Sequence, residues 1–209
     1  MVFSEISKKW WELLQLIKMS YSLGFTSGAL LYKEAKQYVA AISSLEDYLL
    51  KTESVSNTHI PTNSETSRKK IKTELDKRLR FLNEDYLKLF TNTDEKNQKI
   101  ILLLAVCKSY TIISEFLLAV IYSKWKRFDY DVSTYDFSYF LSEKLSAEQM
   151  DSISDQTKYK LSQVAVKMLK DVGMLTENQI NQVFPSEELT TILNKNGDGW
   201  FLNCLLITK

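Results

Sequence analysis

Glycine and proline are scarce in this sequence: five glycines and two prolines occur among 209 residues. A β-sandwich or β-barrel needs a turn about every ten residues, and glycine and proline are the usual turn residues. Their scarcity argues against a many-stranded sheet protein and against most glycine-rich phosphate loops. The composition therefore favours a protein built from helices.

Residues that commonly perform catalysis or bind metals are also few. The chain has one histidine, His59, and two cysteines, Cys107 and Cys204, which form no CxxC pair. His59 lies in a polar stretch where a solvated side chain is expected, and Asp129 and Asp131 lack the further oxygen ligands of a calcium loop. No P-loop, GxGxxG, GxSxG or HExxH motif occurs. The sequence therefore predicts a protein that is not an enzyme and needs no metal, cofactor or small-molecule substrate.

Signals for export or membrane insertion are weak. Residues 1–18 have no basic n-region, so we expect no signal peptide. Eighteen of the 23 residues from 100 to 122 are apolar, but Lys108, Thr111 and Glu115 interrupt them and share one helix face. This segment is expected to be a buried core helix. A cytoplasmic location is the corresponding expectation, with Cys107 as a buried thiol.

Apolar residues recur at helical spacing along most of the chain, which has 44% hydrophobic and 25% charged residues. This composition is sufficient for a sizeable core. The predicted helices cover residues 7–19, 28–42, 45–50, 67–82, 83–90, 99–126, 134–141, 155–172, 176–183 and 186–193, and one strand covers 200–207.

Residues 91–98 contain no apolar side chain and mark the predicted domain boundary. We predict an all-α, mostly helical fold of two packed helical subdomains, with helix-turn-helix or winged-helix-like character and one short C-terminal strand or hairpin. The N-terminal domain would span residues 1–92 and contain a basic helix at 67–82. The C-terminal domain would span residues 97–209 and contain a long core helix at 99–126.

The basic helix concentrates positive charge in a chain whose net charge is only +1. Residues 68–80 hold seven basic and two acidic side chains. At 100° per residue, the buried stripe and the charged face separate. Ile71, Leu75, Leu79 and Leu82 form the stripe, Arg68 and Arg78 flank it as candidates for internal ion pairs, and Lys69, Lys70, Thr73, Lys77 and Arg80 lie opposite.

Outward cations on a helix that follows a polar loop suit binding to a phosphate backbone. Thr66 and Ser67 at the start of the helix could donate hydrogen bonds to a phosphate, together with the free backbone amides there. The alternative is a solvated face on which Lys70 and Glu74 support each other. The residues by themselves leave both interpretations open.

Two further segments have alternative interpretations. Residues 155–209 could form a winged helix whose main helix carries Lys158, Lys160, Lys167 and Lys170, or a plain helical subdomain. The aromatic segment 125–140 could be a protein-interaction surface, because tyrosine, tryptophan and phenylalanine are favoured interface anchors. The alternative is that its rings belong to the core.

Several motifs taken together resemble the BrxA family, the small accessory proteins of BREX bacteriophage-defence systems. No single motif is a chemical signature, but their order and spacing are specific. They are SYSLGFTSGAL at 20–30, the pattern KKI…EL..RL..L starting at Lys69, LLLAVCKSYTIISEF at 102–116, FDYDVSTYDFSYF at 128–140, residues 154–175 ending in MLKDVGML, and FPSEELTTIL at 184–193.

The resemblance implies a mostly helical, non-catalytic, cytoplasmic protein that binds double-stranded DNA. It also implies work beside other BREX proteins: a methyltransferase, an alkaline-phosphatase-like protein, ATPases and a Lon-like protein. An early likeness of the family to NusB-type antitermination proteins makes RNA an alternative ligand, and an adaptor that assembles the BREX complex is a further alternative. The expected DNA-binding residues are those of the basic helix: Thr66, Ser67, Lys69, Lys70, Thr73, Lys77 and Arg80.

Overall fold

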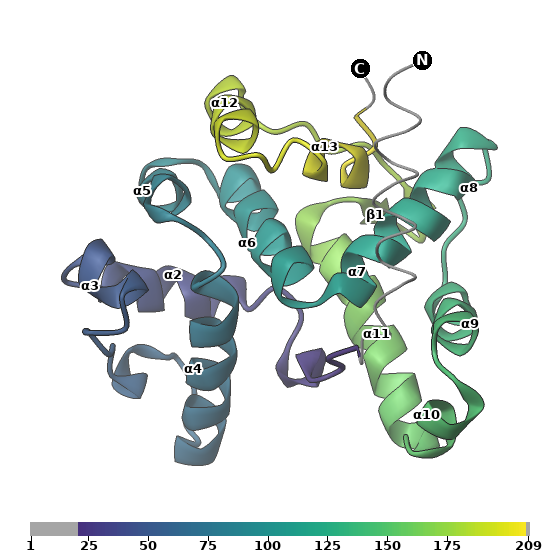
Figure 1. Ribbon diagram of the computed structural model, residues 1–209, viewed down its shortest axis with the longest axis horizontal. Coiled ribbons are helices and arrows are strands. Elements are labelled where there is room, and N and C mark those ends of the chain that lie inside the picture. The colour runs from purple at the N-terminus through teal and green to yellow at the C-terminus, as the bar shows by residue number, and fades with distance from the viewer. Residues whose placement is uncertain (1–20, 208–209) are drawn as a thin grey trace.

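A computed structural model describes residues 21–207 as a mostly helical protein, which confirms the predicted fold class (Figure 1). The helix expected at residues 7–19 lies outside the described residues. The first elements are η1 (Phe25–Ser27), α2 (Tyr32–Ala40), α3 (Leu45–Leu49), η2 (Asn57–His59), α4 (Glu65–Leu79), α5 (Glu84–Asn92) and α6 (Glu95–Ser109). They are followed by α7 (Thr111–Phe116), the π-helical η3 (Leu117–Ile121), α8 (Tyr122–Lys126), α9 (Thr134–Lys144), α10 (Ala147–Asp151), α11 (Asp155–Val172), β1 (Leu175–Thr176), β2 (Gln179–Ile180), α12 (Glu187–Lys195) and α13 (Phe201–Cys204).

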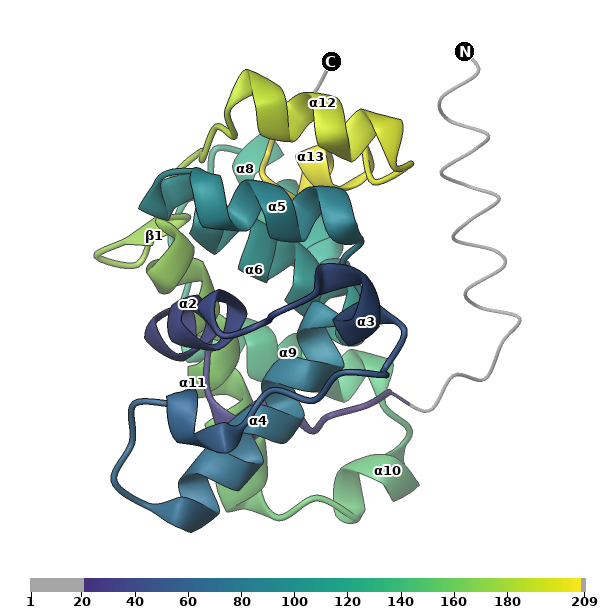
Figure 2. The same ribbon diagram turned by 90° about the vertical axis from the view of Figure 1, so that its left-hand side faces the viewer.

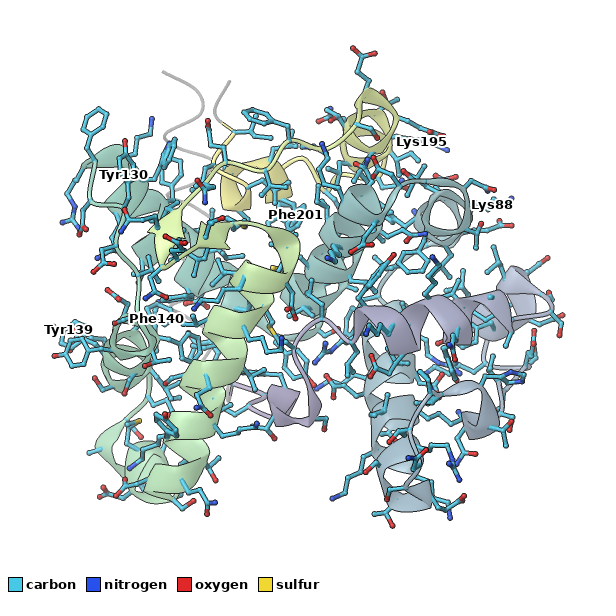
Figure 3. The ribbon with its side chains drawn as sticks, turned by 180° about the vertical axis from the view of Figure 1, so that it is seen from behind. Lys88, Tyr130, Tyr139, Phe140, Lys195 and Phe201 are labelled. Atoms are coloured by element: carbon cyan, nitrogen blue, oxygen red, sulfur yellow. The ribbon has the colours of Figure 1, made fainter. Side chains whose placement is uncertain are left out.

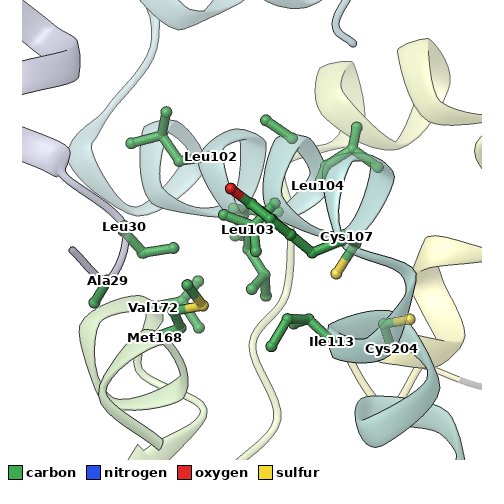
Figure 4. Close-up of a cluster of buried hydrophobic side chains, with 14 of the residues drawn as sticks. Ala29, Leu30, Leu102, Leu103, Leu104, Cys107, Ile113, Met168, Val172 and Cys204 are labelled. Carbon is green, nitrogen blue, oxygen red and sulfur yellow. The ribbon is translucent and has the colours of Figure 1, made fainter. Parts of the chain in front are cut away.

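Helix α6 lies at the centre of the fold, with α2, α4 and α5 on one side and α7 and α11 on the other (Figures 1 and 2). All residues from 100 to 107 are buried, as expected of a helix that is apolar around its whole circumference. Figure 4 shows Leu102 and Leu103 beside Leu30 from the N-terminal segment and Met168 from α11. The core is therefore continuous from Phe25 to Leu206. The proposed division into residues 1–92 and 97–209 stays a prediction.

The single long helix predicted at 99–126 is wrong. Helix α6 ends at Ser109, Tyr110 adopts φ −138° and ψ 87°, and the chain turns by 110° into the α7–α8 segment. Hydropathy and periodicity cannot detect this bend because apolar residues continue on both sides of it. In the described part of the chain, no single helix is both long and apolar enough to cross a membrane.

A buried polar network holds Tyr110 at this bend. Its hydroxyl donates to both carboxylate oxygens of Glu74, at 2.7 and 2.8 Å. The Nε of Arg78 donates to Glu74 Oε1 at 2.5 Å, and its other nitrogens donate to the carbonyl oxygens of Ala29 and Gly28. Arg78 and Glu74 are 1% and 6% exposed, so this network satisfies charges that would otherwise be costly to bury.

Two expectations for the C-terminal third are wrong. Residues 176–183 do not form a helix: β1 and β2 pair antiparallel, and Glu177 and Asn178 turn between them with φ of 50° and 68°. Positive φ at both central residues is what a two-residue hairpin turn requires. Residues 200–207 do not form a strand but contain α13, in which Phe201, Leu202 and Cys204 are buried. A short apolar run does not distinguish a strand from a buried helix.

Side-chain caps define several helix ends. Ser44, Ser133 and Ser154 cap α3, α9 and α11 through their side chains, and Gly173 ends α11 in the left-handed conformation. The start of α4 differs from expectation by one to two residues. Ser64 is its N-cap, so Thr66 and Ser67 lie inside the first turn.

Removal of the Glu74 carboxylate should destabilise the fold far more than removal of an exposed charge. We expect Glu74→Ala to lower the free energy of unfolding by about 3–5 kcal/mol, because Arg78 would remain buried without its partner. Tyr110→Phe should cost about 1.5–3 kcal/mol through loss of hydrogen bonds to a charged group. Urea unfolding followed by circular dichroism measures both. Lys88→Ala, which breaks an exposed pair with Glu84, is the control, and an equal cost for Glu74→Ala and this control would contradict the role of the network.

Candidate nucleic-acid interface

The two halves of α4 differ in how deeply their side chains are buried. Its buried residues, Glu74, Leu75, Arg78 and Leu79, all lie in the C-terminal half, which packs against α6. The N-terminal half follows the polar segment that contains η2, and it begins with Ser64 accepting a hydrogen bond from the amide of Ser67. The N-terminal half is therefore the part of α4 that is available to a ligand.

Four of the predicted contact residues, Thr66, Lys69, Lys70 and Thr73, are exposed. The ammonium group of Lys69 lies 3.3 Å from Glu65, and its side chain is 69% exposed. No ion pair involves Lys70 among the described residues. Ser67 is half-buried, and its amide is occupied by the N-cap. These residues form a small polar and basic surface, which we call the α4 tip.

Lys77 and Arg80 do not share this surface, which corrects the expectation of one outward basic face. Lys77 Nζ lies 4.0 Å from the centre of the Tyr110 ring and donates to Ser22 at 2.9 Å. The Arg80 guanidinium lies 4.9 Å from the centre of the Tyr48 ring. Aromatic faces attract cations, so both side chains fold back onto the protein. Helical spacing at 100° per residue could not predict this, because it contains no information about neighbouring elements.

Asp76 pairs with a further cation of α4 and keeps it within the fold. Its carboxylate accepts hydrogen bonds from Tyr38 and Tyr48 at 2.8 and 3.0 Å, and it pairs with Lys72 at 2.6 Å. Burial, together with the nearby carboxylate, raises the pKa of both tyrosines above their usual range. Lys72 is thus engaged within the fold and adds little to the α4 tip.

Of the two arginines predicted to form internal ion pairs, Arg78 does so inside the fold, whereas Arg68 pairs with an exposed glutamate. Arg78 pairs with Glu74, and Arg68 lies 3.0 Å from Glu65 while donating to the carbonyl oxygen of Thr62 at 2.7 Å. Hydrogen bonds from Arg68 and Lys69 lower the pKa of Glu65. Glu65 therefore stays charged and offsets part of the positive charge at the α4 tip.

The second basic helix, α11, is exposed along one face. Lys160, Lys167 and Lys170 are exposed, with Lys167 3.0 Å from Asp171, and the half-buried Lys158 lies 3.1 Å from Asp155. Basic charge was the only sequence signal for this helix, and it does not point to three uncharged exposed residues on α11: Gln156, Tyr159 and Gln163.

The aromatic segment contributes both to the core and to the surface. Phe137 and Phe140 are buried, whereas Phe128, Tyr135 and Tyr139 are 80%, 73% and 55% exposed. The rings of Tyr135 and Tyr139 stack with centroids 6.3 Å apart. Figure 3 shows Tyr139 pointing away from the body while Phe140 points inward. We call the three exposed rings the aromatic edge.

Catalytic or metal-binding chemistry has little support in the described residues. His59 is exposed, Asp129 pairs with Lys124 at 2.9 Å, and no group of three or more histidine, cysteine or acidic side chains between residues 21 and 207 could hold a metal ion. Cys107 and Cys204 are both buried, and burial raises the pKa of the Cys107 thiol. A protonated, buried thiol is a poor nucleophile.

Comparison with known proteins identifies both a family and a fold. A family model described as BrxA matches residues 19–197. The BREX protein BrxA of Bacillus cereus (strain H3081.97) is 23% identical over 192 residues, which cover 89% of this chain and 96% of that protein. The crystal structure of an uncharacterized protein from Magnetospirillum magneticum has a TM-score of 0.67 at 16% identity, covering 88% of this chain and 97% of the other. The structural match shows a shared fold.

The different environments of Arg80 and Lys70 predict different effects on stability. Arg80→Ala should lower the free energy of unfolding by about 1–2 kcal/mol, because it removes a half-buried side chain from the Tyr48 ring. Lys70→Ala should change it by less than about 0.5 kcal/mol. Thermal or urea unfolding of the two variants tests this. If both variants were as stable as the unaltered chain, the packing of Arg80 on the Tyr48 ring would not contribute to stability.

Proposed function

Because the chain belongs to the BrxA family, we propose that it is a non-catalytic accessory protein of a BREX phage-defence system that binds duplex DNA. The similar protein from Bacillus cereus is named as a BREX protein, which supports the defence role. We further propose that the protein acts in the cytoplasm beside other BREX proteins.

The observation that carries the DNA-binding proposal is the exposure of Lys69 and Lys70 at the α4 tip. Thr66 and Thr73 are also exposed and flank these lysines, and the Thr73 hydroxyl donates to the carbonyl oxygen of Lys69 at 3.0 Å. Lysine ammonium groups and hydroxyls are common donors to phosphate oxygens, and such contacts position a protein on DNA without reading its sequence. Little sequence preference is therefore expected from this surface alone.

Counterion release determines how strongly DNA binding by the α4 tip should depend on salt. Each neutralised phosphate contributes about −0.9 to the slope of log K against log salt, so Lys69 and Lys70 together account for about −1.8. This corresponds to roughly a 12-fold loss of affinity between 50 and 200 mM salt. Lys77 and Arg80, which contact aromatic rings, are not counted. With a net charge of +1, the whole chain adds little non-specific attraction.

An adaptor role is the second proposal, and the aromatic edge favours it. Exposed tyrosine and phenylalanine side chains are frequent anchors at protein interfaces. Three such rings lie within twelve residues of each other, and Phe128 is 80% exposed. A protein component of the BREX system is the proposed partner for this surface. The two roles use different parts of the chain, because the aromatic edge lies within residues 128–139 and the α4 tip within residues 66–73.

The DNA-binding proposal predicts that charge reversal at the α4 tip impairs binding. Lys69→Glu combined with Lys70→Glu should weaken binding to a labelled DNA duplex by at least tenfold at 50 mM salt and reduce the salt slope by about 1.8. Fluorescence anisotropy measures both quantities. Competition with an RNA duplex tests the RNA alternative in the same assay.

The matched control is Lys88→Glu combined with Lys195→Glu. These exposed lysines lie far from the start of α4, at the opposite end of the molecule (Figure 3), and their reversal changes the net charge equally. Circular dichroism confirms folding of each variant. Equal loss in both variants would indicate a net-charge effect, and unchanged binding by the α4 variant would refute a DNA contact there.

The adaptor proposal predicts loss of a protein partner without loss of stability. Phe128→Ser, Tyr135→Ser and Tyr139→Ser together should weaken association with a purified BREX component by more than tenfold, because exposed anchors are truncated without opening the core. Light scattering or co-purification detects the complex. Phe184→Ser, at a ring that is 57% exposed elsewhere, is the control. Full retention of every complex by the triple variant would exclude this surface.

A further inference from the structure

The helical run from Thr111 to Lys126 has one side that is partly open to solvent. Elements α7, η3 and α8 follow one another without a break along the side of the molecule (Figure 1). The inner side is buried in the core and carries Ile112, Ile113, Phe116, Leu117 and Ile121. The outer side carries Leu118, which is 37% exposed, and the half-buried Tyr122 and Trp125. We call these three residues the outer stripe.

The outer stripe has the form of a helix-packing surface. Its members lie four and three positions apart in the sequence, so each is about one helical turn from the next. Ala119 and Val120 beside it are also half-buried. Apolar side chains that are exposed singly are common on protein surfaces, whereas a row at helical spacing buries its area when a second helix packs along it.

Tyr21, the first described residue, is held at one end of the outer stripe. Its hydroxyl donates to the two carboxylate oxygens of Glu115 at 3.1 and 3.0 Å. Glu115 is 8% exposed and also pairs with Lys144 at 2.6 Å. Burial and the Glu115 carboxylate raise the pKa of Tyr21 to about 12, so the hydroxyl keeps its proton at neutral pH. Glu115 precedes Leu118 by three residues, or about 4.5 Å along the helix.

The sequence that precedes Tyr21 carries a matching apolar pattern. At 100° per residue, six apolar side chains fall within an arc of about 100°. They are Phe3, Ile6, Trp10, Leu13, Leu14 and Ile17, whereas Glu5, Lys8, Glu12 and Gln15 fall on the opposite side. A single helix of this length is only marginally stable in water, so it needs a partner that buries its apolar side. The BrxA family model begins its match at residue 19, so this pattern is a feature of this chain.

The spacing of the two stripes agrees, and the outer stripe is within reach. Ile17 precedes Tyr21 by four residues, which span at most about 14 Å. A helix that leads from Tyr21 toward Trp125 runs antiparallel to the run from α7 to α8. Ile17 and Trp10 are seven residues apart, as are Leu118 and Trp125, so each pair is separated by about 10.5 Å along its helix.

We propose that residues 3–17 form an amphipathic helix that packs antiparallel on the outer stripe of the same chain. Ile17 lies beside Leu118, and Trp10 lies beside Trp125. Leu13 and Leu14, between them, cover Tyr122. The first turn extends past Trp125 toward Tyr130, whose ring centroid lies 5.0 Å from that of Trp125. This inference does not depend on the proposed function.

The short tether favours this occupant over a second copy of the chain. Three residues, 18–20, join the segment to Tyr21, so its effective concentration at the outer stripe is on the order of millimolar. A second copy competes only at its bulk concentration. Docking within one chain should therefore be independent of protein concentration in the micromolar range.

The test is hydrogen–deuterium exchange of the full chain, measured by mass spectrometry on peptides that cover residues 6–17. Leu118→Asp combined with Tyr122→Asp should speed exchange in these peptides by about tenfold or more, because a helix without a partner opens readily. The matched control is Leu50→Asp combined with Phe184→Asp. These side chains are 65% and 57% exposed elsewhere on the molecule, and their substitution should leave residues 6–17 unchanged.

A second variant changes the segment and leaves the described residues intact. Leu14→Asp combined with Ile17→Asp should also speed exchange at residues 6–17. Hydroxyl-radical footprinting should then find Tyr122 and Trp125 modified faster, because the side chains that cover them have left. Peptides from residues 100–107 of the buried α6 helix report on folding in every sample. If the Leu118 variant lost protection there, the Leu14 variant would decide.

Each outcome supports or overturns the docking of residues 3–17. Slow exchange that both variants abolish, at every protein concentration, supports it. Fast exchange of residues 6–17 in the unaltered chain would overturn it, as would slow exchange that the folded Leu118 variant retains. Protection that increases with protein concentration, together with a dimer mass in light scattering that the Leu14 variant loses, would assign the segment to a second copy and overturn docking within one chain.

Discussion

The buried ion pair of Glu74 and Arg78 connects three parts of the chain that are far apart in sequence. Arg78 holds the carbonyl oxygens of Gly28 and Ala29, and Glu74 accepts the hydroxyl of Tyr110. Charged groups with so little solvent are stable only when each has its partners, so the three segments must assemble together. The bend between α6 and α7 and the seating of α4 both follow from this constraint.

The same constraint divides the cations of α4 into two groups. The C-terminal half of the helix is held against α6, where Tyr110 and Tyr48 offer ring faces to Lys77 and Arg80. Among the described residues, no such ring face lies against the N-terminal half, and Lys69 and Lys70 are exposed. A basic segment is thus not a uniform binding surface, because tertiary contacts decide which charges remain available to a ligand.

Much of the local structure was readable because its causes are local. Serine caps, the terminal Gly173 and the helical periodicity of α11 act within a few residues, so these helix ends could be predicted. Prediction failed where contacts with residues far away in the sequence determine the local structure. The hairpin at 175–180 depends on its position beside Asp131, and α13 is an apolar run that is buried on several sides.

Composition, periodicity and motif order are properties of the chain, so the helical class, the basic character of residues 68–80 and the family likeness follow from the residues alone. Packing between distant segments determines which charges are exposed and where the core helix bends. Exposure depends on what packs against each face, as Arg80 against Tyr48 and Tyr110 against Glu74 illustrate. The exposed face of α11 follows the helical spacing of Gln156, Lys160 and Gln163, and packing of the opposite face against α9 and α6 leaves it at the surface.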